Sequence, residues 1–221
     1  LEALDADALA ANACLFGGGT AMALRYGEYR ESVDIGFLVS RVEGYRQLRQ
    51  KLTGPDGMRA VTRAGHALSQ TRALRADQYG IRTLLQFDGA DIKFEIVLEA
   101  RIELDGLSDE NSVCGVRTLT HVDQVAEKLL ANSDRWADDE VDSRDLIDLA
   151  MMLKDGRIPR AALEKAGRAY NSIEADLETA KAHIERPGRL ARCMANMQMT
   201  QPPALVLDRI RKLKPAPTAT S

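Results

Sequence analysis

The sequence predicts an α+β protein, in which a mixed α/β half is followed by an all-helical half. In the first half, apolar residues alternate with polar ones over short runs, as in half-buried strands, between stretches with helical spacing. From about residue 120 onward apolar residues recur only at helical spacing. We therefore expect an α/β domain over residues 1–118, a helical domain over 119–214 and a disordered tail over 215–221.

The elements of the first half follow from these patterns. Helical stretches are expected near residues 4–12, 21–26 and 44–52, and a strand near 33–39. The clearest strands are residues 79–87 and 91–98. Asp88 and Gly89 join them, and this dipeptide is typical of a tight hairpin turn.

The second half reads as a series of helices. Apolar residues recur every three or four positions over residues 122–130 and 146–153. Further helices are expected at 159–169, 172–185, 187–196 and 202–213. Pro159 and Pro187 are placed to open two of them, since proline is favoured in the first turn of a helix.

Composition limits the functional classes. The 221 residues carry a net charge of −3, with 45% hydrophobic and 29% charged residues, which is ordinary for a globular protein. Nucleic-acid binding would therefore need a local basic patch. Three cysteines without metal-ligand spacing suit a reducing compartment. With an acidic start and no long apolar run, the sequence leads us to expect a cytoplasmic protein that makes no membrane contact.

A glycine cluster is the first candidate for chemistry. Gly17, Gly18, Gly19 and Thr20 lie between a short apolar run and a helical stretch. Backbone N–H groups at such a helix start can bind an anion, and the Thr20 hydroxyl adds a donor. The alternative is a tight turn in which Thr20 caps the helix.

Carboxylates on two predicted strands form the second candidate. Asp34 and position 36 share one face of the strand at 33–39, and position 36 is a glycine. Glu95 lies on the polar face of the strand at 91–98. If both strands belong to one sheet, Asp34 and Glu95 converge beside the glycine cluster, as Mg²⁺-dependent phosphoryl transfer requires. The alternative is that Glu95 pairs with Lys93 or with a cross-strand neighbour.

The helical half contributes further polar candidates. Lys128 points away from the apolar stripe of its helix, and Asp145 and Asp148 are neighbours on one helix face. Periodicity alone favours the interpretation that all three are solvated. A C-terminal cluster of basic residues could contact RNA phosphates, although stabilisation of a helix end is the favoured interpretation; it comprises Arg209, Arg211, Lys212 and Lys214.

Four segments in order resemble the AbiEii/AbiGii-type nucleotidyltransferase family, whose members are toxins of abortive-infection, type IV toxin–antitoxin systems. The segments are GGGTAMALRYGEYRESVDIGF, DIKFEIVLEARI, AEKLLANSDRW and SRDLIDLA. The resemblance covers about residues 14–153. It implies the DNA polymerase β-like fold, with a mixed sheet, a helical domain after it and an active site in the cleft between them.

The resemblance also implies an activity and roles for residues. The activity is transfer of a nucleotidyl group from an NTP to an acceptor, in some members the 3′ end of a tRNA, and a cognate antitoxin is an implied partner. The nucleotide-binding residues implied are Gly18, Gly19, Thr20, Arg30, Ser32 and Lys128. Asp34 and Glu95 are the implied Mg²⁺ ligands, and Asp145 and Asp148 fall in the family's Arg-Asp-x-x-Asp motif.

Gly36 departs from the family pattern, which has an aspartate there. Metal binding should weaken without it, so the predicted activity is nucleotidyl transfer that is weakened or lost. Two origins stay open: a naturally degenerate member, or an aspartate replaced to disarm a toxin. The alternative function is a non-catalytic module that binds a nucleotide or a partner with the same fold.

Overall fold

The computed structural model describes residues 1–105 and 111–217. The chain divides into two compact units. Unit 1 comprises Leu1–Arg25 and Ser32–Thr120, and unit 2 comprises Tyr26–Glu31 and His121–Ser221. Residues 26–31, from the first half of the sequence, therefore belong to the helical unit. The predicted boundary at residue 118 assigns them to the α/β domain instead.

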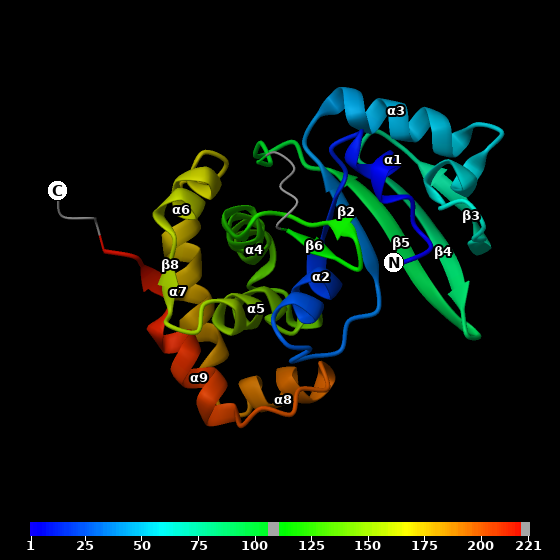
Figure 1. The fold of residues 1–221 in the computed structure, drawn as a ribbon. Coiled ribbons are helices and arrows are strands. Elements are labelled where there is room, and N and C mark those ends of the chain that lie inside the picture. Colours follow the sequence, from blue (N-terminus) through cyan, green and yellow to red (C-terminus); the bar gives the residue numbers. More distant parts are fainter. Residues whose placement is uncertain (106–110, 218–221) are drawn as a thin grey trace. The chain divides into compact units, whose positions relative to one another are not determined.

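Unit 1 contains a mixed five-stranded sheet in the order β1-β2-β5-β4-β3 (Figure 1). Strand β2 runs parallel to β5, whereas the other neighbouring pairs are antiparallel. The strands are β1 (Leu15–Gly17), β2 (Ile35–Val39), β3 (Ser69–Ala76), β4 (Gly80–Phe87) and β5 (Ala90–Leu98). The expected α+β class with a mixed sheet is confirmed.

The helices of unit 1 are short, and together with the sheet they bury its core. They are α1 (Ala6–Ala10), α2 (Gly18–Arg25), α3 (Val42–Thr53) and the 3₁₀ turn η1 (Gly57–Val61). Alternate strand residues face this core, among them Phe37, Phe94 and Ile96, and the rings of Phe37 and Phe94 lie 5.7 Å apart. A small hairpin, β6 (Ser112–Val113) and β7 (Val116–Arg117), completes the unit.

The β4–β5 hairpin confirms the turn prediction. Asp88 and Gly89 both have positive φ, at 48° and 82°, as a two-residue turn matching the strand twist requires. The edge strand β3 is almost entirely exposed and carries two register shifts against β4. Its sequence shows no alternation because neither of its faces is buried.

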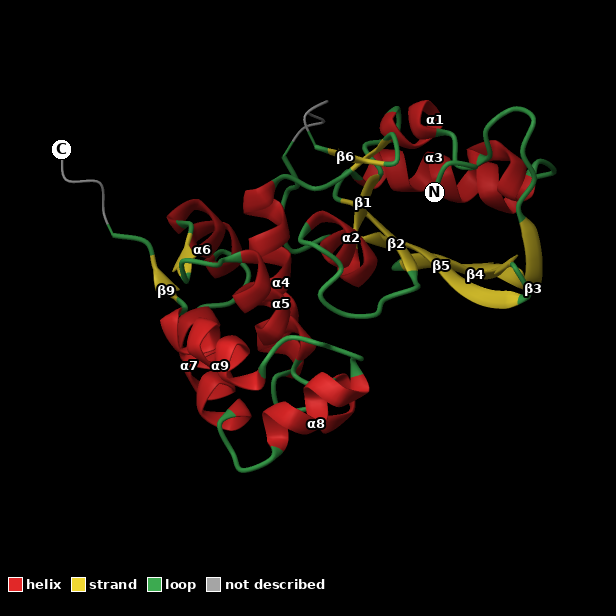
Figure 2. Cartoon of the chain, turned by 60° about the horizontal axis from the view of Figure 1, so that its bottom comes forward, coloured by secondary structure: helices red, strands yellow, loops and turns green. Residues whose placement is uncertain are grey.

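Unit 2 contains helices α4 to α9 and a short parallel strand pair (Figure 2). The four helices expected after residue 158 are confirmed to within two residues at each end. Gly188, at φ 75°, precedes α8, so Pro187 lies outside the helix that it was expected to open. The elements are α4 (His121–Arg135), η2 (Asp139–Val141), α5 (Arg144–Met152), β8 (Arg157–Ile158), α6 (Arg160–Gly167), α7 (Ile173–Ile184), α8 (Arg189–Asn196), α9 (Pro203–Lys212) and β9 (Lys214–Pro215).

The C-terminal residues begin in an ordered pairing. Strand β9 pairs with β8, so Pro215, which was expected in a disordered tail, has a partner strand. Residues 218–221 of that predicted tail lie outside the described residues. Within the described part of the chain, no helix has both the length and the apolar character that crossing a bilayer demands.

Candidate functional site

The glycine cluster forms the turn from β1 into α2. Gly18 adopts a left-handed backbone at φ 73°, a conformation that glycine adopts without steric cost. At Gly17 a Cβ would lie 2.3 Å from Cδ1 of Leu38, so a larger residue there would force the leucine side chain to move. The turn thus brings the start of an eight-residue helix to the end of β1, where its N–H groups favour an anion.

Thr20 ties this turn to the residues before β2. Its hydroxyl donates to the backbone carbonyl of Asp34 and lies 2.9 Å from the Ser32 hydroxyl. Since Thr20 has one hydroxyl proton, Ser32 is the donor in the second bond. The expected alternative, in which Thr20 caps its own helix, does not match these contacts.

Gly36 lies in the middle of the candidate metal site. Its register partners are Gly17 on β1 and Glu95 on β5, so position 36 and Glu95 share one face of the sheet. A Cβ built at Gly36 would contact only the carbonyl oxygen of Gly17, at 3.6 Å, an ordinary van der Waals distance. Packing therefore does not require glycine here, and the backbone accommodates a side chain.

Glu95 is ion-paired with two basic neighbours. Arg82 Nε lies 2.5 Å and Lys93 Nζ 2.6 Å from its carboxylate oxygens. Partial burial opposes ionisation, but the bonds from Lys93 and Arg82 outweigh it and lower the pKa of Glu95. These are the contacts of the alternative interpretation, in which Glu95 is paired within the sheet.

The carboxylates present do not fit a complete divalent-metal centre. Among the residues that the structure describes, no three histidine, cysteine or acidic side chains converge in a metal-binding group. Asp34 is exposed at the start of β2, and both oxygens of Glu95 face cations. Position 36, a glycine, contributes no oxygen donor to this face.

A second group of predicted site residues meets in the interior of unit 2. We call it the buried ion cluster; it comprises Tyr29, Arg30, Lys128, Arg135, Asp145 and Asp148. Lys128 Nζ lies 2.9 Å from Asp145 Oδ1 and 2.6 Å from Asp148 Oδ2. Arg30 binds Asp148 through two nitrogens, at 2.7 and 2.9 Å.

Two further residues complete the charge pairing. Tyr29 donates its hydroxyl to Asp148 Oδ1 at 2.7 Å, and Arg135 binds both oxygens of Asp145 at 2.7 and 3.0 Å. Sequence reasoning missed both residues. Arg135 lies two helical turns after Lys128, on the same face of α4, which was the available indication. For Tyr29 the sequence offered no comparable indication beyond its position next to Arg30.

The expectation that Lys128, Asp145 and Asp148 are solvated is wrong. Their exposed fractions are 7%, 3% and 0%. Helix α5 is buried on all sides, so its polar face meets other side chains rather than water. Burying these charges is tolerated because each has close partners of opposite sign.

The electrostatics of the cluster follow from these pairs. Burial opposes ionisation of Asp145 and Asp148, but the neighbouring cations outweigh it and lower the pKa of both carboxyl groups. Burial likewise opposes the charge on Lys128, whose pKa the two carboxylates raise. Three cations thus surround the two carboxylates, and the Asp134 carboxylate adds a further negative charge near Arg135.

The predicted site residues thus fall into two groups. Gly18, Gly19, Thr20, Ser32, Asp34, Gly36 and Glu95 belong to unit 1, and Arg30, Lys128, Asp145 and Asp148 belong to unit 2. In the first group the structure links Thr20 with Ser32 and with the backbone of Asp34, and in the second it joins all four residues by ion pairs. That both groups serve one active site stays a prediction.

Solved structures share this fold. A candidate nucleotidyltransferase from H. pylori matches with a TM-score of 0.52 and 16% identity over 93% of this chain and 88% of that chain. JHP933 from Helicobacter pylori matches with a TM-score of 0.50 and 17% identity over 94% and 84%. No curated protein matches.

The family model of the nucleotidyl transferase AbiEii toxin, type IV TA system, matches residues 1–217. The match includes both groups of predicted site residues and the helices that follow them. It confirms the resemblance found in the four sequence segments and extends it to the C-terminal helices. This chain belongs to the AbiEii family of nucleotidyltransferase toxins of type IV toxin–antitoxin systems.

Proposed function

We propose that this nucleotidyltransferase binds an NTP at the glycine turn, and that the glycine at position 36 weakens its nucleotidyl transfer or abolishes it. The proposed acceptor is an RNA, such as the 3′ end of a tRNA. A cognate antitoxin is the proposed protein partner, and the cytoplasm is the proposed compartment.

The geometry at Gly36 carries this proposal. Position 36 pairs in register with Glu95, follows Asp34 by two residues and has room for a Cβ. A carboxylate there would join Asp34 and Glu95 on one face, beside the anion-binding helix start at Gly18. When bound, Mg²⁺ would supply charge neutralisation at the NTP phosphates, and the carboxylates now present would hold it poorly.

We propose that Arg30 and Lys128 of unit 2 contribute to nucleotide binding, and that Asp145 and Asp148 hold these two cations in place. Each cation already has a carboxylate partner, which supports a positioning role for the two aspartates.

The decisive experiment restores the carboxylate. We expect Gly36→Asp to transfer labelled nucleotide from at least one of the four NTPs to total RNA in the presence of Mg²⁺. Gly36→Asn is the matched control, because it adds nearly the same volume without a charge. Transfer by Gly36→Asn equal to that of Gly36→Asp would contradict a metal role, and no transfer by either variant would count against catalysis.

A second candidate function is a non-catalytic nucleotide-binding module, favoured by the pairing of Glu95 with Arg82 and Lys93. It predicts NTP binding that calorimetry finds unchanged when Mg²⁺ is removed or Asp34 is replaced by alanine. Loss of binding on either change would favour the catalytic proposal instead.

A further inference from the structure

Strands β3, β4 and β5 of unit 1 have one covered face and one open face. On the covered face Phe94 and Ile96 are fully buried. Leu48 of α3 belongs to the same core, and Figure 2 shows α3 on this side of the strands. On the open face the side chains of Arg82 and Lys93 are 41% and 46% exposed. A ligand can therefore reach this face from solvent.

The open face carries a row of residues that begins at the candidate metal site. Gly36 of β2 pairs in register with Glu95 of β5, and Glu95 pairs with Arg82 of β4. Arg82 in turn pairs with Arg75 of the edge strand β3. Paired residues share a face of the sheet. Because neighbouring strands lie about 4.8 Å apart, the row extends about 14 Å from Gly36 to Arg75.

A β-bulge brings a second arginine of β3 to this face. Arg72 and Arg75 are three residues apart, a spacing that points side chains to opposite faces of a regular strand. Their partners on β4, Leu84 and Arg82, are two residues apart, and a register shift separates the two pairs. The extra residue of the bulge therefore places both arginines on the open face.

These two arginines are free to bind a ligand. Both are exposed, and within the described part of the chain neither guanidinium forms an ion pair or a hydrogen bond. A guanidinium group binds phosphate and carboxylate oxygens with charge-assisted hydrogen bonds. Arg72 and Arg75 therefore favour an anionic ligand that extends along the open face.

The acidic residues of this face are already engaged. Glu95 lies 2.5 Å from Arg82 Nε and 2.6 Å from Lys93 Nζ. Asp91 accepts a hydrogen bond from the Thr71 hydroxyl at 2.8 Å. Neither carboxylate is bound to an arginine of β3, so an incoming anion does not have to displace one there.

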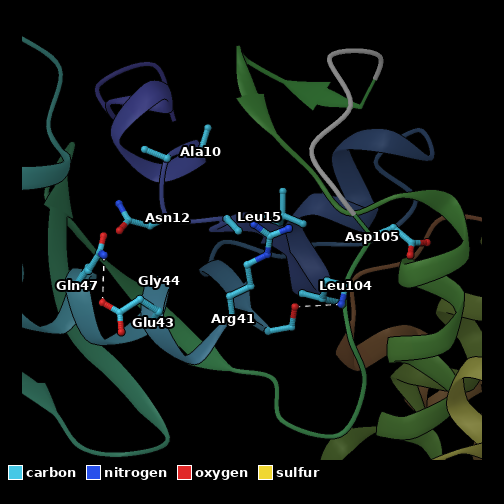
Figure 3. Close-up of a pocket in the computed structure, with 12 residues that line it drawn as sticks. Ala10, Asn12, Leu15, Arg41, Glu43, Gly44, Gln47, Leu104 and Asp105 are labelled. Atoms are coloured by element: carbon cyan, nitrogen blue, oxygen red, sulfur yellow. Dashed lines mark hydrogen bonds between the residues drawn. The ribbon is translucent and has the colours of Figure 1, made fainter.

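The pocket of unit 1 is not part of this face. It has a volume of about 290 Å³, and its lining residues come from α1, β1, α3 and the segments after β2 and β5 (Figure 3). The cation of α3 nearest to it differs from those of β3, because Arg46 lies 4.0 Å from Glu43. Figure 3 shows that Glu43 also accepts a hydrogen bond from Gln47.

We propose that Arg72 and Arg75 bind phosphates of a single-stranded RNA acceptor, whose 3′ end lies at Glu95 and position 36. This proposal rests on the proposed function, which places nucleotidyl transfer at that end of the row. A single strand carries its charges along a line, as the row does. At a rise of about 3.4 Å per stacked nucleotide, a row of about 14 Å spans about four nucleotides. Contacts to phosphates position the strand without reading its bases.

The test measures binding of a fluorescent single-stranded RNA of about twelve nucleotides to the full chain by anisotropy, without NTP or Mg²⁺. We expect Arg72→Gln combined with Arg75→Gln to weaken binding at least about tenfold for every RNA sequence. The slope of log affinity against log salt should fall in magnitude by about 1.4, at about 0.7 for each lost phosphate contact. Arg75→Lys should retain most of the affinity, because it keeps the charge.

Arg46→Gln is the matched control, because Arg46 is an exposed arginine of α3 on the covered side of the sheet. It should bind RNA normally, and a loss equal to that of the double variant would overturn the proposal. The same holds if the chain does not bind RNA, or if the double variant binds it normally. Displacement of the RNA by polyglutamate of equal total charge would also overturn it, because the face would then favour an acidic protein.

A second measurement separates this surface from the proposed function. If Gly36→Asp transfers nucleotide, adding the two β3 substitutions should raise KM for RNA at least about tenfold and leave KM for the NTP unchanged. An unchanged KM for RNA would contradict the binding surface but not the transferase. An inactive Gly36→Asp protein whose RNA binding still depends on Arg72 and Arg75 would contradict the proposed function but not the binding surface.

Discussion

At the scale of single residues, the glycines of unit 1 differ in what they are for. A Cβ added at Gly17 or Gly44 would meet another atom at 2.3 Å, whereas one added at Gly36 would meet none closer than 3.6 Å. Geometry therefore requires glycine at position 44, where the clash is with backbone, whereas at position 17 a leucine side chain would have to move and at position 36 nothing would. A glycine without a packing reason, in a strand, costs stability rather than supplying it.

This difference predicts opposite stability effects. Gly36→Ala should raise the free energy of unfolding by about 0.5–1 kcal/mol, because alanine loses less backbone entropy on folding. Gly44→Ala should lower it by about 1–3 kcal/mol through the clash with the Asn12 backbone. Urea unfolding followed by circular dichroism measures both values, and a destabilised Gly36→Ala would show that position 36 is tighter than its geometry indicates.

Lys128 provides a second residue-level prediction. Lys128→Met would leave Asp145 and Asp148 buried with one cation fewer, so we expect a loss of about 3–5 kcal/mol in unfolding free energy. Lys165, partly buried and paired with Asp123, is a comparison site away from the cluster. A Lys128→Met protein as stable as the parent would mean that the cluster repacks or hydrates freely.

The pKa shifts of the cluster predict a pH dependence. The pKa values of Asp145 and Asp148 are lowered in the folded state, so their stabilisation is present above the unfolded value of about 3.9. It is lost as the pH falls below that value, through their folded pKa values. We expect urea midpoints to fall below about pH 4, and to fall less steeply in Asp145→Asn; equal slopes would contradict this assignment.

At the scale of elements, the start of α5 is held in an unfavourable conformation. Asp142 and Ser143 both have left-handed backbones, at φ 53° and 48°, directly before the helix that carries Asp145 and Asp148. Asn196 of α8 donates to Asp142 at 2.9 Å, and Arg189 donates to the Ser143 hydroxyl at 3.2 Å and to Asp139. Two strained residues persist only where neighbours fix them.

Removing Arg189 should therefore loosen α5 before it unfolds the protein. We expect Arg189→Met to lower stability by about 1–3 kcal/mol and to speed amide hydrogen exchange in the first turn of α5. Arg192, exposed on the same helix, supplies the control variant Arg192→Met. Unchanged exchange in α5 would show that α8 does not fix the turn.

Sequence patterns predicted most elements, because periodicity and turn chemistry act locally. The β4–β5 hairpin follows from Asp88-Gly89, and α4 and α5 follow from their apolar spacing. The solvated interpretation of Asp148 failed, because its partners Tyr29 and Arg30 are more than a hundred positions away in the sequence. Periodicity records which face is polar, but it does not record whether water or an ion pair satisfies that face.

At the scale of the whole molecule, the path of the chain joins the two units through residues 26–31. Tyr29 and Arg30 fix this segment to Asp148, and the Glu31 amide donates to the Met197 carbonyl at 3.1 Å. The segment connects α2, which starts at the glycine turn, with β2, which follows Asp34. The helical unit is therefore complete only when residues from the first half are present.

A fragment test follows from this path. Residues 121–217 alone would lack the donors that Tyr29 and Arg30 supply to Asp148, so we expect a partly unfolded fragment with broad amide resonances. Adding a synthetic peptide of residues 26–31 at high concentration should sharpen part of the spectrum. A well-folded fragment without the peptide would contradict the structural role of this segment.

The position of residues 26–31 has a practical consequence for swapping parts between family members. A chimera cut once, between the sheet and the helices, would combine the Arg30 of one parent with the Asp148 of the other. Recombination that respects the fold needs three junctions, at 25/26, 31/32 and 120/121. When parts are exchanged at these three junctions, Arg30 and Asp148 come from the same parent and remain matched. After a single crossover they match only by chance.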